Sequence, residues 1–249
     1  MNNGLILVTG ASGKLGSVLV DKLGSEHIVS PTRAELDITN SKSVSTYFEK
    51  NKGISKVIHC AALTNMPECE KSPGNAMNVN MVGTLNLINE SSKIKNLKFI
   101  YISTDYVYPC ESGNYKEDDV VAPFNNYAWS KFAGECTVKN IANHCIVRTS
   151  FFDPNKIPFD TAPIDVFCSK LPIDELAINI ISLLDNNFTG VINVGQEKIS
   201  LYELYLKYKP SIQPTTLSEI LKIAPIKRAK DSSLDITLWK EIRSQINGN

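Results

Sequence analysis

The 249-residue sequence lacks three features that would each have set its class: a long apolar run, a net charge and a spaced set of metal ligands. No apolar run approaches the roughly 20 residues that span a bilayer, and the first residues lack the basic flank of a signal or transit peptide. Lys and Arg number 26 against 26 Asp and Glu, so no positive field is available to hold a nucleic acid. We therefore expect a cytoplasmic protein that binds neither membranes nor nucleic acids.

Metal-binding patterns are also missing. The six cysteines form no CxxC pair and the three histidines form no HExxH motif. We expect no metal site and free thiols, as in a reducing compartment. Hydrophobic residues make up 43% and charged residues 21%, which is typical of a globular chain and excludes disordered and coiled-coil classes.

Short apolar runs alternate with segments of helical period along most of the chain. The runs predict strands at residues 5–8, 27–30, 57–60, 98–102, 145–148 and 191–194, and helices are expected at 16–23, 41–50, 75–92, 127–140 and 173–184. Nearly continuous apolar strands are typical of a parallel sheet that is buried on both faces. The pattern predicts an α/β fold with a Rossmann-type, doubly wound parallel sheet.

The regular alternation ends after residue 152, where four prolines occur within about 20 residues. We expect a dinucleotide-binding core at residues 1–152, a substrate loop at 153–172 and a helix and strand returning to the core at 173–196. Helices predicted at 200–208, 216–223 and 235–246 form a small, mainly helical cap over residues 197–249.

A glycine-rich turn follows the first predicted strand. Gly10, Gly13 and Gly16 stand in the spacing GxxGxxG between that strand and a helix. Glycines there permit a tight turn, a close approach of backbone amides to a pyrophosphate, and helix packing on the strand. The first βαβ unit therefore predicts a dinucleotide site.

The end of the second strand indicates which dinucleotide binds. Enzymes that prefer NAD usually place an acidic residue there for the adenosine ribose. This chain instead has Arg33, whose guanidinium suits a 2′-phosphate, and Lys14 is a second candidate cation. NADP(H) is favoured, NAD(H) stays an alternative, and Asp37 is better placed for the adenine.

A second pattern predicts proton-transfer chemistry. Tyr127 and Lys131 are four residues apart on one helix, so they share a face. A lysine ammonium stabilises a nearby phenolate, which makes Tyr127 a plausible acid. Thr104 follows the fourth buried strand and can offer a hydroxyl to the same substrate oxygen.

Together these patterns resemble the extended short-chain dehydrogenase/reductase superfamily. The motifs HCAAL (59–63), LDIT (36–39), STDYVY (103–108), YAWSK (127–131), FAGE (132–135), VRTS (147–150) and SSLD (232–235) are most similar to the dTDP-4-dehydrorhamnose reductase family. The resemblance covers residues 4–235. It implies an NAD(P)H-dependent reduction of a nucleotide-linked 4-keto-6-deoxy sugar, and it leaves a homodimer open.

The resemblance also implies site residues. Thr104, Tyr127 and Lys131 match the catalytic positions. The cofactor positions are Gly10, Ser12, Gly13, Leu15, Gly16, Asp37, Ile38, Ala61, Ala62, Tyr127 and Lys131, to which the charges above add Lys14 and Arg33. Thr104, Asp105, Tyr106 and Phe151 are expected to contact substrate. The substrate region at residues 151–171 is short, and Phe151 replaces the family's usual tryptophan.

Two other functions stay open. One is a related nucleotide-sugar dehydratase or epimerase. The 4,6-dehydratases need Asp-Glu after the threonine, but Asp105 is followed here by Tyr106, so the base of that reaction is missing. The epimerase-reductases have a cysteine at the position of Asp105, and this chain lacks it. A non-catalytic regulatory subunit similar to the methionine adenosyltransferase beta subunit is the alternative from another class. The complete Thr104, Tyr127 and Lys131 set favours an enzyme.

Overall fold

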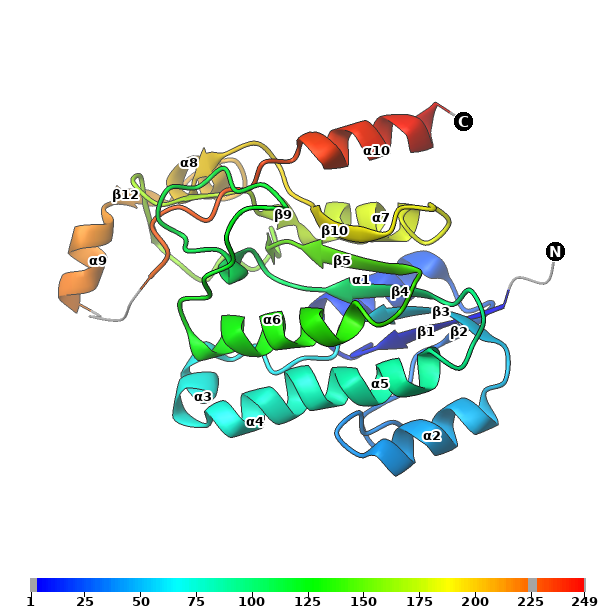
Figure 1. Cartoon of the computed structure of the whole chain (residues 1–249). Coiled ribbons are helices and arrows are strands. Elements are labelled where there is room, and N and C mark those ends of the chain that lie inside the picture. The colour runs from blue at the N-terminus through cyan, green and yellow to red at the C-terminus, as the bar shows by residue number, and fades with distance from the viewer. Residues whose placement is uncertain (1–3, 224–227, 249) are drawn as a thin grey trace. The chain divides into compact units, whose positions relative to one another are not determined.

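A six-stranded sheet is the central feature of the fold (Figure 1). The computed structural model describes residues 4–223 and 228–248. The strand order is β10, β5, β4, β3, β1, β2, with bounds β1 Leu5–Thr9, β2 Ile28–Val29, β3 Ile54–His59, β4 Lys98–Ile102, β5 His144–Arg148 and β10 Gly190–Asn193. The pairs β1–β2, β1–β3, β3–β4 and β4–β5 are parallel. The predicted α/β class with a doubly wound parallel sheet is confirmed.

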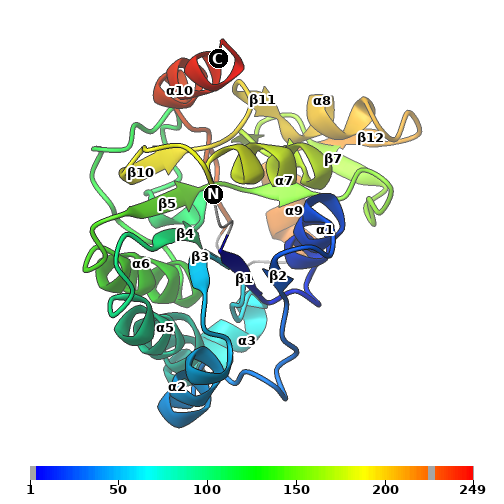
Figure 2. The same ribbon diagram turned by 90° about the vertical axis from the view of Figure 1, so that its right-hand side faces the viewer.

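Helices pack on both faces of this sheet, as Figure 2 shows. The helices α2 Ser41–Lys50, α5 Gly83–Ser91 and α6 Asn126–Val138 lie on one face, and α1 Lys14–Leu23 lies on the other. The strands bury apolar side chains on both sides, which explains their nearly continuous apolar runs. Because β1 lies between β2 and β3, the topological switch point lies at the carboxyl ends of β1 and β3.

Two helical features differ from the prediction. The expected helix at 75–92 is continuous from α4 Pro73–Met77 to α5, but residues Asn78–Val82 between them form a π-helix. The short helix α3 Met66–Lys71 was not predicted, and its start is capped by the Asn65 side chain, which accepts from the Glu68 amide at 3.0 Å. Strand β3 begins at Ile54, three residues before the predicted start at residue 57, and Ile54 is buried in the core.

Contacts divide the chain into two compact units. The first comprises residues 1–104, 125–148 and 177–192, and the second comprises 105–124, 149–176 and 193–249. These units follow different boundaries from the predicted segments, since residues 105–124 group with the later part of the chain. The reason is local pairing within the second unit, where Tyr115 bonds to Ser233 and Asp235 through backbone groups.

The second unit contains the predicted helices as α8 Leu201–Leu206, α9 Leu217–Ile223 and α10 Thr237–Asn247. The segment predicted as a substrate loop, 153–172, contains three short strands. The segment holds β7 Thr161–Pro163, β8 Phe167–Cys168 and β9 Leu171–Pro172, which pair with β12 Gln213–Thr215, β11 Ile199–Ser200 and β6 Phe151–Phe152. Two-stranded pairs tolerate proline because each strand keeps an unpaired edge.

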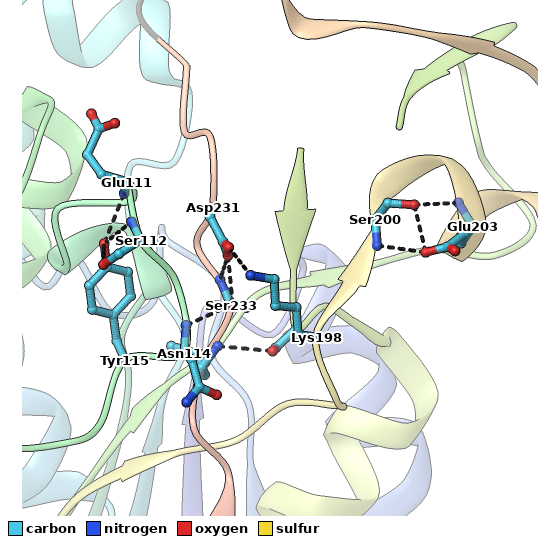
Figure 3. Close-up of polar contacts among 11 residues, drawn as sticks. Glu111, Ser112, Asn114, Tyr115, Lys198, Ser200, Glu203, Asp231 and Ser233 are labelled. Atoms are coloured by element: carbon cyan, nitrogen blue, oxygen red, sulfur yellow. Dashed lines mark hydrogen bonds and ion pairs between the residues drawn. The ribbon is translucent and has the colours of Figure 1, made fainter. Parts of the chain in front are cut away.

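The SSLD segment helps to hold the second unit together (Figure 3). Ser233 accepts the Asn114 amide at 2.8 Å, and the Asp231 carboxylate accepts both the backbone amide and the hydroxyl of Ser233. The Lys198 ammonium lies 2.5 Å from the other Asp231 oxygen. In the same view, Ser200 and Glu203 form the capping box that starts α8.

Within residues 4–223 and 228–248, every helix is too short or too polar to cross a membrane.

Candidate active site

The glycine turn between β1 and α1 requires residues without side chains. Gly10 has φ of +69°, and a Cβ at this position would lie 2.6 Å from the Ala61 nitrogen. A Cβ on Gly16 would lie 2.2 Å from the Gly10 carbonyl oxygen. Gly13 is the N-cap of α1, which has no side-chain cap and no acidic residue in its first turn. Its terminal amides are therefore available to an anion.

A cavity of about 260 Å³ lies at this turn, entirely within the first unit. It is lined by Thr9, Gly10, Ser12, Gly13, Pro31, Arg33, Leu36, Asp37, Ile38, Thr39, Cys60, Ala61, Ala62 and Val79. Eight predicted cofactor residues are among them. Lys14, Leu15, Gly16, Tyr127 and Lys131 do not line it, and Leu15 and Gly16 are buried in α1 instead.

Arg33 reaches this cavity from a tight turn. The Glu35 carboxylate accepts the Thr32 amide at 2.8 Å and the Thr32 hydroxyl at 2.9 Å, and these bonds lower the pKa of Glu35. The first acidic side chain after β2 is thus hydrogen-bonded within its own turn. Arg33 is exposed and makes no ion pair within the described part of the chain.

Asp37 is fixed by its own neighbours. Its carboxylate accepts the Thr39 hydroxyl at 2.7 Å and the Thr39 amide at 3.0 Å, while its amide donates to the Ser43 hydroxyl at 3.1 Å. The Thr39 bonds are the main cause of a lowered pKa of Asp37, and Arg33 lowers it further. Asp37 therefore presents a rigid, charged carboxylate to the cavity.

A buried histidine beneath the cavity was not predicted as a site residue. His59 is 1% exposed, and its Nδ1 lies 2.7 Å from the Thr9 hydroxyl and its Nε2 3.0 Å from the Thr84 hydroxyl. Thr84 donates to the Asn80 carbonyl oxygen, so its oxygen accepts the Nε2 proton of a neutral imidazole. Burial lowers the pKa of His59 to about 3, and the Lys131 charge lowers it too.

The π-helix connects this histidine to α6. Its Asn80 side chain accepts the Leu63 amide at 2.7 Å and donates to the Ser130 hydroxyl at 2.8 Å. Ser130 in turn donates to the Tyr127 carbonyl oxygen at 2.7 Å. A single line of hydrogen bonds thus runs from the end of β1 to the first turn of α6.

Tyr127 and Lys131 lie in the first two turns of α6, which begins at the Asn125 cap. Tyr127 is half-buried, Lys131 is 3% exposed, and Thr104 is 5% exposed just after β4. Burial lowers the pKa of Lys131 to about 7, an effect that Cys60 and Glu135 partly oppose. A lysine of this kind changes its charge close to neutral pH.

A buried ion pair lies in the next turn of α6. Arg148 contacts the Glu135 carboxylate through Nη2 at 2.8 Å, and neither side chain is more than 3% exposed. Ser103 donates to the same carboxylate at 2.5 Å. Glu135 of α6 thus contacts Ser103, which follows β4, and Arg148, which ends β5. These two residues immediately precede Thr104 and Thr149 in the sequence.

The expected substrate residues of the second unit have different surroundings. Asp105 is 1% exposed and accepts the Ser150 hydroxyl at 2.8 Å. The Tyr106 ring packs edge-on to Phe124 with 5.1 Å between centroids, and burial raises the pKa of Tyr106 to about 12. Phe151 is half-buried in β6.

Among residues 4–223 and 228–248, no group of three or more His, Cys, Asp or Glu side chains is arranged to hold a metal ion.

Curated relatives match more than half of the chain. The dTDP-4-keto-6-deoxy-D-glucose reductase of Streptomyces niveus is 35% identical over 150 residues, and the dTDP-4-dehydrorhamnose reductase of Aggregatibacter actinomycetemcomitans is 34% identical over 152 residues. The alignments cover 58% and 59% of this chain. The chain spans about half the length, 51%, of each of these relatives.

A solved structure extends the similarity to nearly the whole chain. The dTDP-4-dehydrorhamnose reductase of Bacillus anthracis, in complex with NADP, is 26% identical with a TM-score of 0.84. The alignment covers 97% of this chain and 92% of that one. The family model described as the RmlD substrate binding domain matches residues 4–155, from β1 past the Tyr127 helix and β5. With more than half of its length in this match, the chain belongs to the RmlD substrate binding domain family.

Proposed function

We propose that the chain is an NADPH-dependent reductase of a nucleotide-linked 4-keto-6-deoxy sugar. The observation that carries the proposal is the combination, in one compact unit, of the cavity at the uncapped start of α1 with the buried Lys131 one turn after Tyr127. The names of the relatives in Streptomyces niveus and Aggregatibacter actinomycetemcomitans support the same substrate class.

The residues that line the cavity fit the adenosine and phosphate groups of NADP(H). Amides in the first turn of α1 would bind the pyrophosphate, because the helix has no side-chain cap. Arg33 would bind a 2′-phosphate, and Asp37 with Ile38 would contact the adenine end. The B. anthracis structure contains NADP, which supports this choice of cofactor.

When bound, the reduced nicotinamide supplies a hydride to the sugar carbonyl carbon. Tyr127 donates its phenolic proton to the oxygen of that carbonyl, and Thr104 donates a hydrogen bond to the same oxygen. The charged Lys131 favours the phenolate left on Tyr127 and would contact the nicotinamide ribose.

A direct test measures oxidation of NADPH and NADH by the purified protein with dTDP-, UDP-, GDP- and CDP-linked 4-keto-6-deoxy sugars. We expect turnover with NADPH and at least one of these substrates. Tyr127→Phe is the matched control for contaminating reductases, since it keeps the ring and removes the proton. Cofactor binding without turnover on any substrate would contradict the proposal and favour a binding subunit.

A further inference from the structure

The charge of Lys131 lies in an unusual environment. Its ammonium is buried, and within the described residues it forms no ion pair with a carboxylate, since Glu135 is already paired with Arg148. The ammonium lies over the ring of Tyr101, whose centroid is 4.0 Å from Nζ. Tyr101 is fully buried in β4. A cation over an aromatic face is attracted by the ring quadrupole, and more strongly when water is excluded.

The same tyrosine also contacts the backbone of α6. Its hydroxyl donates to the Lys131 carbonyl oxygen at 3.1 Å. This approach depends on Gly134, because a Cβ there would lie 2.2 Å from the Tyr101 hydroxyl. The ring therefore supports the end of the Lys131 side chain while the hydroxyl supports its backbone.

We propose that Tyr101 is a positioning residue for Lys131: its ring stabilises the ammonium and its hydroxyl fixes the helical turn that carries it. This inference rests on the proposed function only where it concerns turnover. Tyr101 acts through Lys131 and is not itself a proton donor, because burial raises its pKa well above the ordinary value.

Other groups around the ammonium act in different directions. His59 is neutral, with its ring centroid 5.6 Å from that of Tyr101. Burial raises the pKa of the Cys60 thiol to about 12, so Cys60 is also neutral near pH 7. The Glu135 charge favours protonated Lys131, but Glu135 also forms an ion pair with Arg148. Tyr127 lies four residues before Lys131 on α6. The Tyr101 ring is thus a direct contact that opposes the cost of burying the ammonium, in addition to the charge of Glu135.

The test measures the protonation of Lys131 without cofactor. The protein is prepared with isotopically labelled lysine, the Lys131 signal is assigned from its absence in Lys131→Arg, and its shift is followed by NMR against pH. The variants are Tyr101→Phe, Tyr101→Leu and 3,4,5-trifluorophenylalanine at position 101, which keeps the shape of phenylalanine and removes most of its quadrupole.

We expect Tyr101→Phe to retain the wild-type midpoint. The trifluorinated ring and Tyr101→Leu should move it to lower pH by about one pH unit, since the ring then no longer favours the charged form. Phe99→Leu is the matched control, because it removes another buried ring of β4 from the same core and should leave the midpoint unchanged. Equal midpoints for phenylalanine and its trifluorinated form would overturn the proposal, even if Tyr101→Leu fails to fold.

Turnover provides a second measurement. The alkaline limb of kcat should shift in the same order as the NMR midpoints. Absence of turnover in the wild-type protein would contradict the proposed function alone, because the NMR titration still decides the role of Tyr101.

Discussion

The Thr9 hydroxyl donates a hydrogen bond to Nδ1 of His59 over 2.7 Å, joining the carboxyl ends of β1 and β3. Thr9 immediately precedes the glycine turn, and its oxygen also accepts the Ala61 amide at 3.3 Å. The imidazole can serve as this acceptor only while it is neutral. The two strand ends that border the cavity are therefore connected through a group that must not gain a proton.

The first prediction concerns stability at low pH. The pKa of His59 is about 3 in the folded chain and 6.5 ordinarily, so below pH 6.5 the unfolded chain binds a proton that the folded chain does not. Stability then falls as pH falls, by about 2 kcal/mol between about pH 7.5 and about pH 5 from this group. Denaturant unfolding of wild type and His59→Asn at both pH values checks it. The variant should lose less stability over this interval, and equal losses would show that His59 is not the cause.

The second prediction concerns the proton donor. Tyr127→Phe should lower kcat by about 10² to 10⁴-fold, the range typical of a lost general acid, and leave the Kd of NADPH within about twofold. Steady-state kinetics and cofactor fluorescence measure the two effects. Tyr47→Phe, which removes a phenolic hydroxyl from α2, is the control and should behave as wild type. Full turnover by Tyr127→Phe would require a different acid.

The third prediction concerns Lys131. Its pKa of about 7 means that it is charged below neutral pH and loses its charge above it, so kcat should decline as pH rises past about 7. Lys131→Met should lower kcat by about 10²-fold and weaken NADPH binding by about tenfold. Lys139→Met removes an exposed lysine of the same helix region and should alter neither quantity. Unchanged NADPH affinity in Lys131→Met would contradict its ribose contact.

The fourth prediction separates the two candidate phosphate contacts. Arg33 lines the cavity and Lys14 does not. Arg33→Ala should therefore raise the Kd of NADPH by about tenfold and leave that of NADH unchanged, as loss of one charge-assisted contact implies. Lys14→Ala is the matched control, with a small effect on both. Similar Kd values for NADPH and NADH in the wild-type protein would remove the basis of this prediction.

The fifth prediction concerns the buried ion pair. Glu135→Ala leaves the Arg148 charge without its partner and should reduce the free energy of unfolding by about 3 to 5 kcal/mol. Replacing both residues, Glu135→Leu with Arg148→Met, should cost less than the single change because no buried charge remains. Denaturant unfolding of the three proteins measures this. A double variant less stable than Glu135→Ala would show that the pair itself is strongly favourable.

The sequence predicts the sheet and its flanking helices well because both have strong periodicity. It does not predict α3, which is only six residues long and contains Pro67 near its start. The strands at residues 161–172 are also missed, since two or three residues are too few for a pattern. The π-helix is hidden because its residues continue an apolar helical pattern.

The site is predictable where it depends on the backbone. Gly10 and Gly16 show their constraints in the sequence, and so does the spacing of Tyr127 and Lys131. The contacts of His59 with Thr84 and of Tyr101 with Lys131 join positions 25 and 30 residues apart. Strand β4 is buried along its whole length, so no alternation of polar and apolar residues shows which ring faces α6.

The π-helix also determines where the chain tolerates the loss of one residue. A π-helical turn holds one residue more than an α-helical turn, so deleting one residue within Asn78–Val82 would give a regular α-helix. Each π-helical residue turns by about 80° and each α-helical residue by about 100°, so five residues of the first kind turn about as far as four of the second. Residues after the deletion, Thr84 among them, would therefore keep nearly the same orientation, and the hydrogen bond between Thr84 and His59 would be retained. Alignments of related chains should therefore contain one-residue gaps within Asn78–Val82 more often than in α5 on its carboxyl side.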